Sequence, residues 1–196
     1  MSLQLEGRFV FFATNNVNKF NEARKILAKN KIAIGMLRIK SLEIQSESLE
    51  EIAQSSVTEA FERYRLPMVV EDAGLFVDAL NGFPGPYAAY VYRTVGNKGL
   101  LRLMEDVDNR RAKFKSVVAY FSSQVKSPVC FDGTVTGEIV RKERRASNEM
   151  GFGFDPIFKP DNSDKTFAQM DVVEKCKRSH RAAAFRKFAE WYKQPI

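Results

Sequence analysis

The sequence predicts an α/β protein with a mixed, elongated central β-sheet, helices on both of its faces, and two lobes with an active-site cleft between them. In the first part of the chain, short apolar runs rich in β-branched residues alternate with helical patterns. Two long apolar and alternating runs follow at residues 113–123 and 129–140, and a hairpin of this length can carry a second lobe. No linker, repeat or low-complexity tract divides the chain, so residues 1–196 are expected to form one domain.

The elements of the first half follow in order. Residues 8–13 read as a buried strand, and a helix begins at Asn18, which is expected to cap it. A second extended segment lies at residues 32–39. The next helix spans residues 48–64, and its opening Ser-Leu-Glu-Glu has the pattern of a capping box.

The second half begins with a buried strand at residues 67–70 that ends abruptly at two carboxylates. The Gly-Phe-Pro-Gly-Pro segment at 82–86 is too rich in Gly and Pro for the interior of a helix or strand, so it is a shaped loop. A helix follows at residues 98–105, then the hairpin, and the chain closes with a helix at residues 179–192.

Composition narrows the class of protein. The chain is 44% hydrophobic and 28% charged, which is typical of a folded globular enzyme and not of a disordered chain. No stretch approaches the roughly 20 apolar residues that span a bilayer, and the N-terminus lacks the pattern of a signal peptide. Cys130 and Cys176 have neither metal-type nor redox-type spacing, and we expect both to be small buried residues. A cytoplasmic protein without a membrane partner is therefore expected.

The net charge is +7, and most of the excess lies near the C-terminus. Residues 174–193 contain seven Lys or Arg against two Glu. Such a segment can be a nucleic-acid stripe, a phosphate pocket or a solvated helix face, and the charge alone does not decide between them.

The first candidate site is the run Thr14-Asn15-Asn16-Val17-Asn18-Lys19. A strand, a polar turn and a helix start bring backbone N–H groups and the positive end of the helix dipole to one place. Lys19 adds a mobile cation, while Thr14 and Asn16 add side-chain donors, so the run suits a polyphosphate. By itself it is also an ordinary capped connection, and it lacks the spacing of a Walker loop.

The second candidate site is the pair Glu71-Asp72 at the end of a buried strand, where α/β sheets place their ligands. Mg²⁺ binds one or two carboxylates together with phosphate oxygens and water, and an acid beside it can organise a water for attack. Adjacent side chains on a strand point to opposite faces, so one of the two carboxylates can face away. Glu43 is a further candidate ligand.

The third candidate site lies in the C-terminal part of the chain. Aromatic faces on a Gly-rich backbone stand before a set of polar and basic residues, a combination that suits a purine pocket although each residue alone has an ordinary structural explanation. His180 is the only histidine, and a lone histidine is more often structural than catalytic. The set comprises Phe152, Phe154, Asp155, Lys175, Ser179, His180 and Arg181.

These motifs, with the run at 81–87, occur in the order found in the inosine triphosphate pyrophosphatase family, and the chain resembles that family from its first strand to its last helix. Residues 82–93 are similar to archaeal members. The resemblance implies Mg²⁺-dependent hydrolysis of deaminated purine nucleoside triphosphates (ITP, dITP and XTP) to the monophosphate and pyrophosphate. It also implies a homodimer without a stable nucleic-acid partner.

The resemblance implies the following roles. Thr14, Asn15, Asn16 and Lys19 would hold the triphosphate, and Phe152 and Phe154 would flank the base. Glu43 and Asp72 would bind Mg²⁺, with Glu71 as an alternative ligand, and Asp72 would organise the attacking water. The base edge or the nearby phosphate would be read by Asp155, Lys175, Ser179, His180 and Arg181.

The chain differs from the family pattern at two positions that would contact phosphate. Many family members carry a lysine where this chain has Ser56, and some have a basic residue near Ala89. Phosphate binding is then either weaker here or completed by Arg93 or Lys98. Two alternatives stay open at this point: a general nucleotide phosphatase on the same scaffold, and a nucleic-acid-binding module that uses the basic last helix.

Overall fold

The computed structural model describes residues 8–39, 44–146 and 151–194. Within these residues the chain forms one seven-stranded mixed sheet in the order β2-β1-β3-β5-β6-β7, with β4 paired to β3. The strands are β1 Arg8–Ala13, β2 Ile32–Leu37, β3 Met68–Val77, β4 Pro84–Gly85, β5 Arg111–Phe121, β6 Val129–Ile139 and β7 Phe158–Pro160. The helices are α1 Val17–Ala28, α2 Leu49–Tyr64, α3 Ala88–Thr94, α4 Gly96–Leu103, α5 Val172–Arg178 and α6 His180–Tyr192, with short 3₁₀ turns η1 Asp78–Leu80 and η2 Phe167–Gln169.

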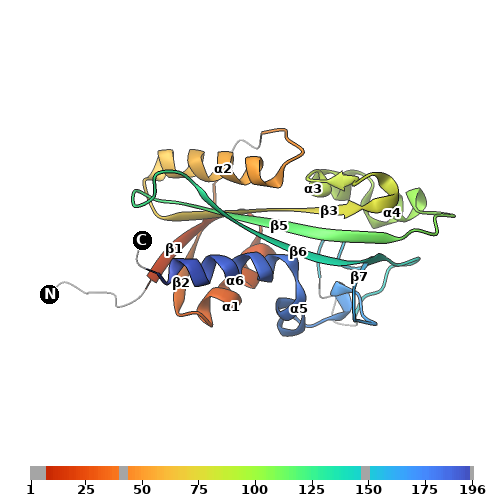
Figure 1. The fold of residues 1–196 in the computed structure, drawn as a ribbon. Helices are drawn as coiled ribbons and strands as arrows, with labels where there is room; N and C mark the ends of the chain where they lie inside the picture. Colours follow the sequence, from red (N-terminus) through yellow and green to blue (C-terminus); the bar gives the residue numbers. More distant parts are fainter. Residues whose placement is uncertain (1–7, 40–43, 147–150, 195–196) are drawn as a thin grey trace.

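Helices cover both faces of the sheet, as the sequence predicts (Figure 1). Helices α2, α3 and α4 lie on one side, and α1, α5 and α6 lie on the other. On the second side, Val10 and Phe12 of β1 pack with Phe185 and Phe188 of α6 in one hydrophobic cluster. Alternate residues along a strand face opposite sides of the sheet. Each buried strand therefore contributes side chains to the hydrophobic layers on both faces.

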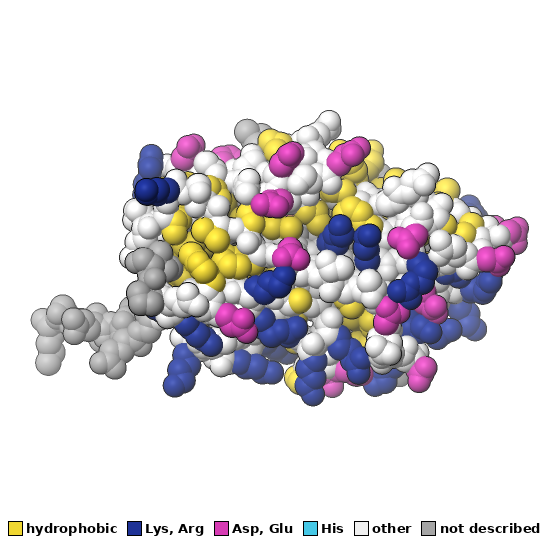
Figure 2. Space-filling view, viewed as in Figure 1, with side chains coloured by type: hydrophobic (Ala, Val, Ile, Leu, Met, Phe, Trp, Pro, Cys, Tyr) yellow, Lys and Arg dark blue, Asp and Glu magenta, His cyan; other side chains and the backbone are white. Residues whose placement is uncertain are grey.

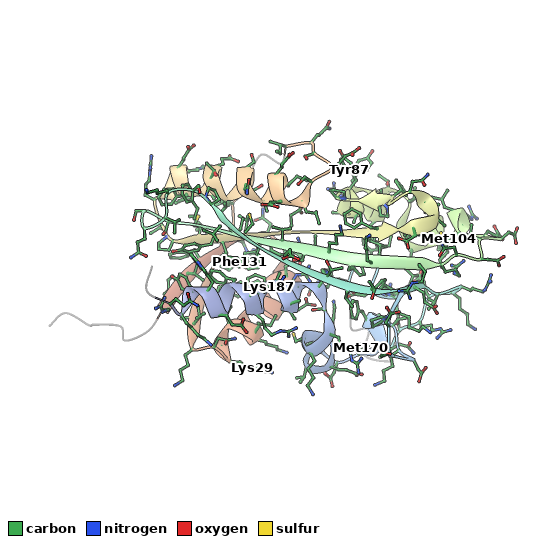
Figure 3. All side chains as sticks on the ribbon, in the orientation of Figure 1. Lys29, Tyr87, Met104, Phe131, Met170 and Lys187 are labelled. Atoms are coloured by element: carbon green, nitrogen blue, oxygen red, sulfur yellow. The ribbon has the colours of Figure 1, made fainter. Side chains whose placement is uncertain are left out.

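The long hairpin β5–β6 runs through the whole molecule and joins its two ends. Its register extends from Arg111 opposite Glu138 to Tyr120 opposite Val129. At one end it packs against α6, and at the other it carries β7 and a separate hydrophobic cluster (Figure 1). Met104 and Met170, labelled in Figure 3, both belong to that cluster.

Strand β3 differs from the prediction. It does not end at Glu71 and Asp72 but continues to Val77, because β5 pairs with it antiparallel along its whole length. The parallel pairing with β1 stops at Val69. The two carboxylates therefore lie in mid-strand, just past the end of β1, at the edge where α1 begins.

Helix starts also differ in detail. Asn16, not Asn18, caps α1, and its Oδ1 accepts from the backbone N–H groups of Asn18 and Lys19. Ser48 caps α2 as predicted, but the Glu51 carboxylate accepts from Ser46 Oγ at 2.7 Å and so does not close the capping box. The helix predicted at 98–105 begins two residues earlier, at Gly96, whose φ of +63° favours glycine. Among the described residues, no helix is both long and apolar enough to cross a membrane.

Gly133 of β6 lies directly under the first turn of α6. A Cβ there would collide with the carbonyl oxygen of His180 and the amide nitrogen of Ala184. We expect Gly133→Ala to lower the free energy of unfolding by about 2–3 kcal/mol, because backbone atoms cannot yield as a flexible side chain can. Urea unfolding measures the loss.

Gly96→Ala is the matched control for this change. Gly96 has a positive φ, but apart from its chain neighbours and its own helix backbone no described residue has an atom within 4 Å of an added Cβ, so only backbone strain of about 1 kcal/mol is expected. Equal losses in the two variants would contradict the close approach of α6 to β6.

Candidate active site

Glu71 and Asp72 point to opposite faces of β3. Val70 and Val117, the latter opposite Asp72 across the strand pair, pack with Leu49 of α2. Alternation places the half-buried side chain of Asp72 on this α2 face. Glu71 points to the other face, where it meets Arg181 of α6. The two adjacent carboxylates therefore lie in different environments, Glu71 on the α6 side of the sheet and Asp72 on the α2 side.

The turn before α1 is fixed by its own polar side chains. Asn15 Nδ2 donates to the Ile39 carbonyl at 2.8 Å, which ties the turn to the end of β2. Thr14 Oγ1 accepts from the Asn16 N–H at 3.1 Å. Because Asn16 uses its Oδ1 as the helix cap, its amide nitrogen is the group left to donate to a ligand.

Lys19 and Glu71 form a contact inside the protein. Lys19 Nζ lies 2.9 Å from Glu71 Oε2 and donates to the Glu71 carbonyl at 3.1 Å. Glu71 Oε1 accepts from Ser116 Oγ at 2.6 Å and from Arg181 Nε at 3.1 Å. Burial by itself would raise the pKa of Glu71, but Arg181 and Lys19 outweigh it and hold that pKa well below its usual range. The Glu71 side chain has no exposed surface. Its Oε2 lies at ion-pair distance from Lys19 but makes no hydrogen bond among the described residues, and its metal role stays a prediction.

Glu22 on α1 continues this set of charges, and the sequence analysis missed it. Its two oxygens contact Lys175 Nζ at 2.8 Å and Arg181 Nη1 at 2.6 Å. Burial opposes its ionisation, yet Arg181 and Lys175 lower the pKa of Glu22 to about 2. A signal was present, because Glu22 stands four residues before Ile26 on the apolar stripe of α1.

Lys175 completes the series through a 2.6 Å contact with Asp155 Oδ2. Three cations and three carboxylates thus alternate in one buried chain of contacts, which we call the charge network. It joins α1, β3, α5, α6 and the loop after residue 150. Its members are Lys19, Glu71, Arg181, Glu22, Lys175 and Asp155.

Of the two predicted stacking residues, the structure places Phe152 against this network. Its ring lies 4.5 Å from Lys175 Nζ and 5.4 Å from the Arg181 guanidinium carbon, and its N–H donates to Asp155 Oδ2 at 2.9 Å. Phe154 is only 3% exposed and meets Tyr92 edge-on at 5.6 Å within a hydrophobic cluster. Its ring would have to move before it could stack on a base.

Ser179 and His180 open the last helix. Ser179 Oγ caps α6 by accepting from the Ala182 N–H at 3.2 Å. The His180 ring stacks on Phe114 with centroids 4.7 Å apart. Burial, followed by the charge of Arg181, lowers the pKa of His180 well below 6.5, so the ring is neutral. Its buried Nδ1 has no hydrogen-bond partner among the described residues, and such an atom calls for a ligand or water.

The remaining predicted residues are not members of the network as the described residues form it. Glu43 is outside the described residues. Ser56 is buried on α2, while Ala89 on α3 is exposed, as are Arg93 and Lys98. In residues 8–39, 44–146 and 151–194, no group of three or more His, Cys, Asp or Glu is placed to hold a metal ion.

The basic C-terminal segment divides between interior and surface. Arg181 and Lys175 are buried in the network. Lys187, labelled on α6 in Figure 3, is exposed and pairs with Asp132 at 2.7 Å. Arg186 donates to the Cys176 carbonyl at 2.9 Å. Two of the seven cations of this segment are thus used inside the protein, and the other five are exposed.

The chain is similar to several known proteins over nearly its whole length. A protein of Methanopyrus kandleri named dITP/XTP pyrophosphatase is 49% identical over 95% of this chain and 97% of its own. One of Hyperthermus butylicus with the same name is 45% identical over 97% of each. The solved structure of the Staphylococcus aureus Ham1 protein has a TM-score of 0.81 at 29% identity, covering 95% of this chain and 98% of that one. The Ham1 family model matches residues 10–191, so the chain belongs to the Ham1 family.

Proposed function

We propose that this chain is a nucleoside triphosphate pyrophosphohydrolase that hydrolyses deaminated purine nucleotides (ITP, dITP and XTP) to the monophosphate and pyrophosphate. The observation that carries the proposal is the near full-length similarity to relatives named dITP/XTP pyrophosphatase. The site offers suitable groups: Lys19 lies at the start of α1 and the neutral ring of His180 at the start of α6, and the half-buried carboxylate of Asp72 lies on the opposite face of β3.

In the proposed mechanism Lys19, Thr14 and Asn16 hold the triphosphate. Lys19 contacts Glu71 in the structure, and its side chain is 19% exposed, so a short rotation would bring its amine to a phosphate. Glu71 would still keep Ser116 and Arg181 as partners. Asp72 orients a water for in-line attack on the α-phosphorus and accepts its proton, and pyrophosphate leaves.

The donor set fits a substrate-bridged Mg²⁺. Asp72 is a half-buried carboxylate that belongs to no three-ligand cluster among the described residues, which suits an ion that takes most of its ligands from phosphate and water. Asp72 would hold it, together with Glu43. When bound, it would offset the negative charge on the phosphate oxygens.

His180 is the residue we assign to base selection. Its neutral ring can donate from one nitrogen and accept at the other, and Nδ1 lacks a partner among the described residues. Inosine and xanthine present a 6-oxo acceptor where adenine presents an amine, so a donor at that position would be left unpaired with ATP. A mismatch of this kind can cost a factor of roughly 10⁴.

Hydrolysis of ITP, XTP, ATP and GTP with Mg²⁺ tests the proposal when pyrophosphate and orthophosphate are measured separately. We expect pyrophosphate from ITP and XTP and little product from ATP or GTP. Orthophosphate, or equal turnover of all four, would instead support the general nucleotide phosphatase. No turnover of any of the four would contradict both the pyrophosphohydrolase and the phosphatase, and would leave the nucleic-acid-binding module as the alternative to test.

Three further features stay predictions of the same proposal. They are a homodimer without a stable nucleic-acid partner, a cytoplasmic location, and two lobes with the active-site cleft between them. The separate hydrophobic clusters at the two ends of the sheet support the last of these.

A further inference from the structure

The end of the sheet where β5 begins and β6 ends carries a hollow of 570 Å³ that is separate from the charge network. Dark blue side chains gather at this end of the molecule, at the right in Figure 2. Five cations line the hollow against two carboxylates, Asp108 and Glu138. The cations are Arg110, Arg111, Arg141, Lys142 and Arg144. The volume lies in the range of small-ligand sites.

Two of these charges are already neutralised by neighbours outside the hollow. Arg111 holds the Asp161 carboxylate in a fork, at 2.7 and 3.0 Å. Glu138 pairs with Lys159 at 2.9 Å. Four cations and Asp108 remain. For Arg141, Lys142 and Arg144, the described part of the chain supplies no carboxylate within ion-pair distance.

Arg110 is a fixed positive charge in the wall of the hollow. Its guanidinium donates to three backbone carbonyls: Ile139 at 2.6 Å, Met104 at 2.7 Å and Val140 at 3.0 Å. Burial and then the nearby charge of Arg141 lower the pKa of Arg110, so the two guanidinium groups repel each other. An anion between them would relieve that repulsion.

The strand end that carries the other cations is held by backbone pairing. The N–H of Val140 donates to the Ile157 carbonyl, and that of Arg144 donates to the Pro156 carbonyl, both at 2.9 Å. Thr166 Oγ1 donates to the Arg144 carbonyl at 2.9 Å. Because these contacts fix the backbone before any ligand arrives, less ordering is needed on binding.

We propose that this hollow binds a small polyphosphate anion, with Arg110, Arg141, Lys142 and Arg144 contacting its oxygens. Guanidinium forks match phosphate oxygens in pairs. Several unpaired cations around one small volume favour a multiply charged anion over a single carboxylate. A nucleic acid would need a longer basic track than one hollow at the end of a sheet. The proposal does not depend on the proposed function, since no residue of the candidate active site lines the hollow.

Calorimetric titration with inorganic tripolyphosphate at low salt and without Mg²⁺ tests the site. The hollow variant combines Arg141→Gln, Lys142→Gln and Arg144→Gln. The control combines Arg24→Gln, Arg63→Gln and Lys126→Gln, which removes two arginines and one lysine from exposed positions elsewhere. We expect the hollow variant to lose one binding event, with affinity falling roughly tenfold for each phosphate contact removed. The control should keep the wild-type isotherm.

Lys19→Ala separates this site from the candidate active site. It should keep the binding event that the hollow variant loses, whether or not the chain hydrolyses nucleotides. An unchanged isotherm in the hollow variant, or no binding by the wild type, would overturn the proposal. Binding of a single-stranded oligonucleotide but not of tripolyphosphate, abolished in the hollow variant, would overturn it in favour of a nucleic-acid surface.

Discussion

Asp72→Asn is expected to lower the rate of pyrophosphate release from ITP by roughly 10²- to 10⁴-fold while the protein stays folded. The amide has the size of the carboxylate but cannot accept a proton from water, and it is a weaker ligand for a hard cation. Asp72 lies on the α2 face of β3 and is not a member of the buried charge network, and asparagine keeps the size of its side chain. Steady-state pyrophosphate release and urea unfolding measure the two effects.

Asp164→Asn is the control, because Asp164 is an exposed carboxylate away from α2 and β3. It should leave both the rate and the unfolding midpoint unchanged. A wild-type rate in Asp72→Asn would remove Asp72 from the mechanism. A large loss of stability in that variant would show that its charge is structural.

Arg181→Met is expected to lower the free energy of unfolding by about 3–5 kcal/mol, the usual cost of removing one partner from a buried ion pair. Arg181 binds both Glu71 and Glu22, so its loss leaves two buried carboxylates with fewer partners. Methionine keeps the unbranched shape of the side chain without its charge. A loss of this size is a large share of the about 5–15 kcal/mol that holds a typical domain folded. Urea unfolding at neutral pH measures it.

Arg178→Met is the matched control, since Arg178 is exposed and donates to the Asn162 carbonyl alone. Its effect should stay within about 0.5 kcal/mol. If Arg181→Met is too unstable to purify, Arg181→Lys keeps the charge without the fork and is expected to lose less. Equal stability of Arg181→Met and the wild type would contradict a contribution of the charge network to folding stability.

The charge network should also make the stability of the wild type depend on pH in the acid range. The pKa of Glu22 is lowered from 4.5 to about 2 on folding, so its ionised form stabilises the native state above pH 4.5. That stabilisation, about 3 kcal/mol for Glu22, is lost as the pH falls from 4.5 towards 2. Arg181→Met should show a shallower loss over the same range, between pH 4.5 and about pH 2, because less of the shift remains to be lost.

The sequence by itself determined the class of fold, most elements and the order of the motifs. Local patterns of apolar residues predict strands β1 and β2, helices α2 and α6 and the β5–β6 hairpin. Such patterns depend only on residues close together in the sequence. The short elements α3, α5, β4 and β7 were not predicted, because an element of so few residues shows too little hydrophobic periodicity to be recognised. The opposite directions of Glu71 and Asp72 were also readable, because alternation is a property of a single strand.

Only the tertiary structure decided which charges meet. Glu22 and Arg181 are 159 positions apart, and Glu71 and Arg181 are 110 apart, so no local pattern can pair them. Tertiary packing also buried Phe154 beside Tyr92 while Phe152 lies under Lys175 and Arg181. The reason is that residue type and spacing set what a side chain can do, whereas burial and the approach of distant segments set which partner it finds and what charge it keeps.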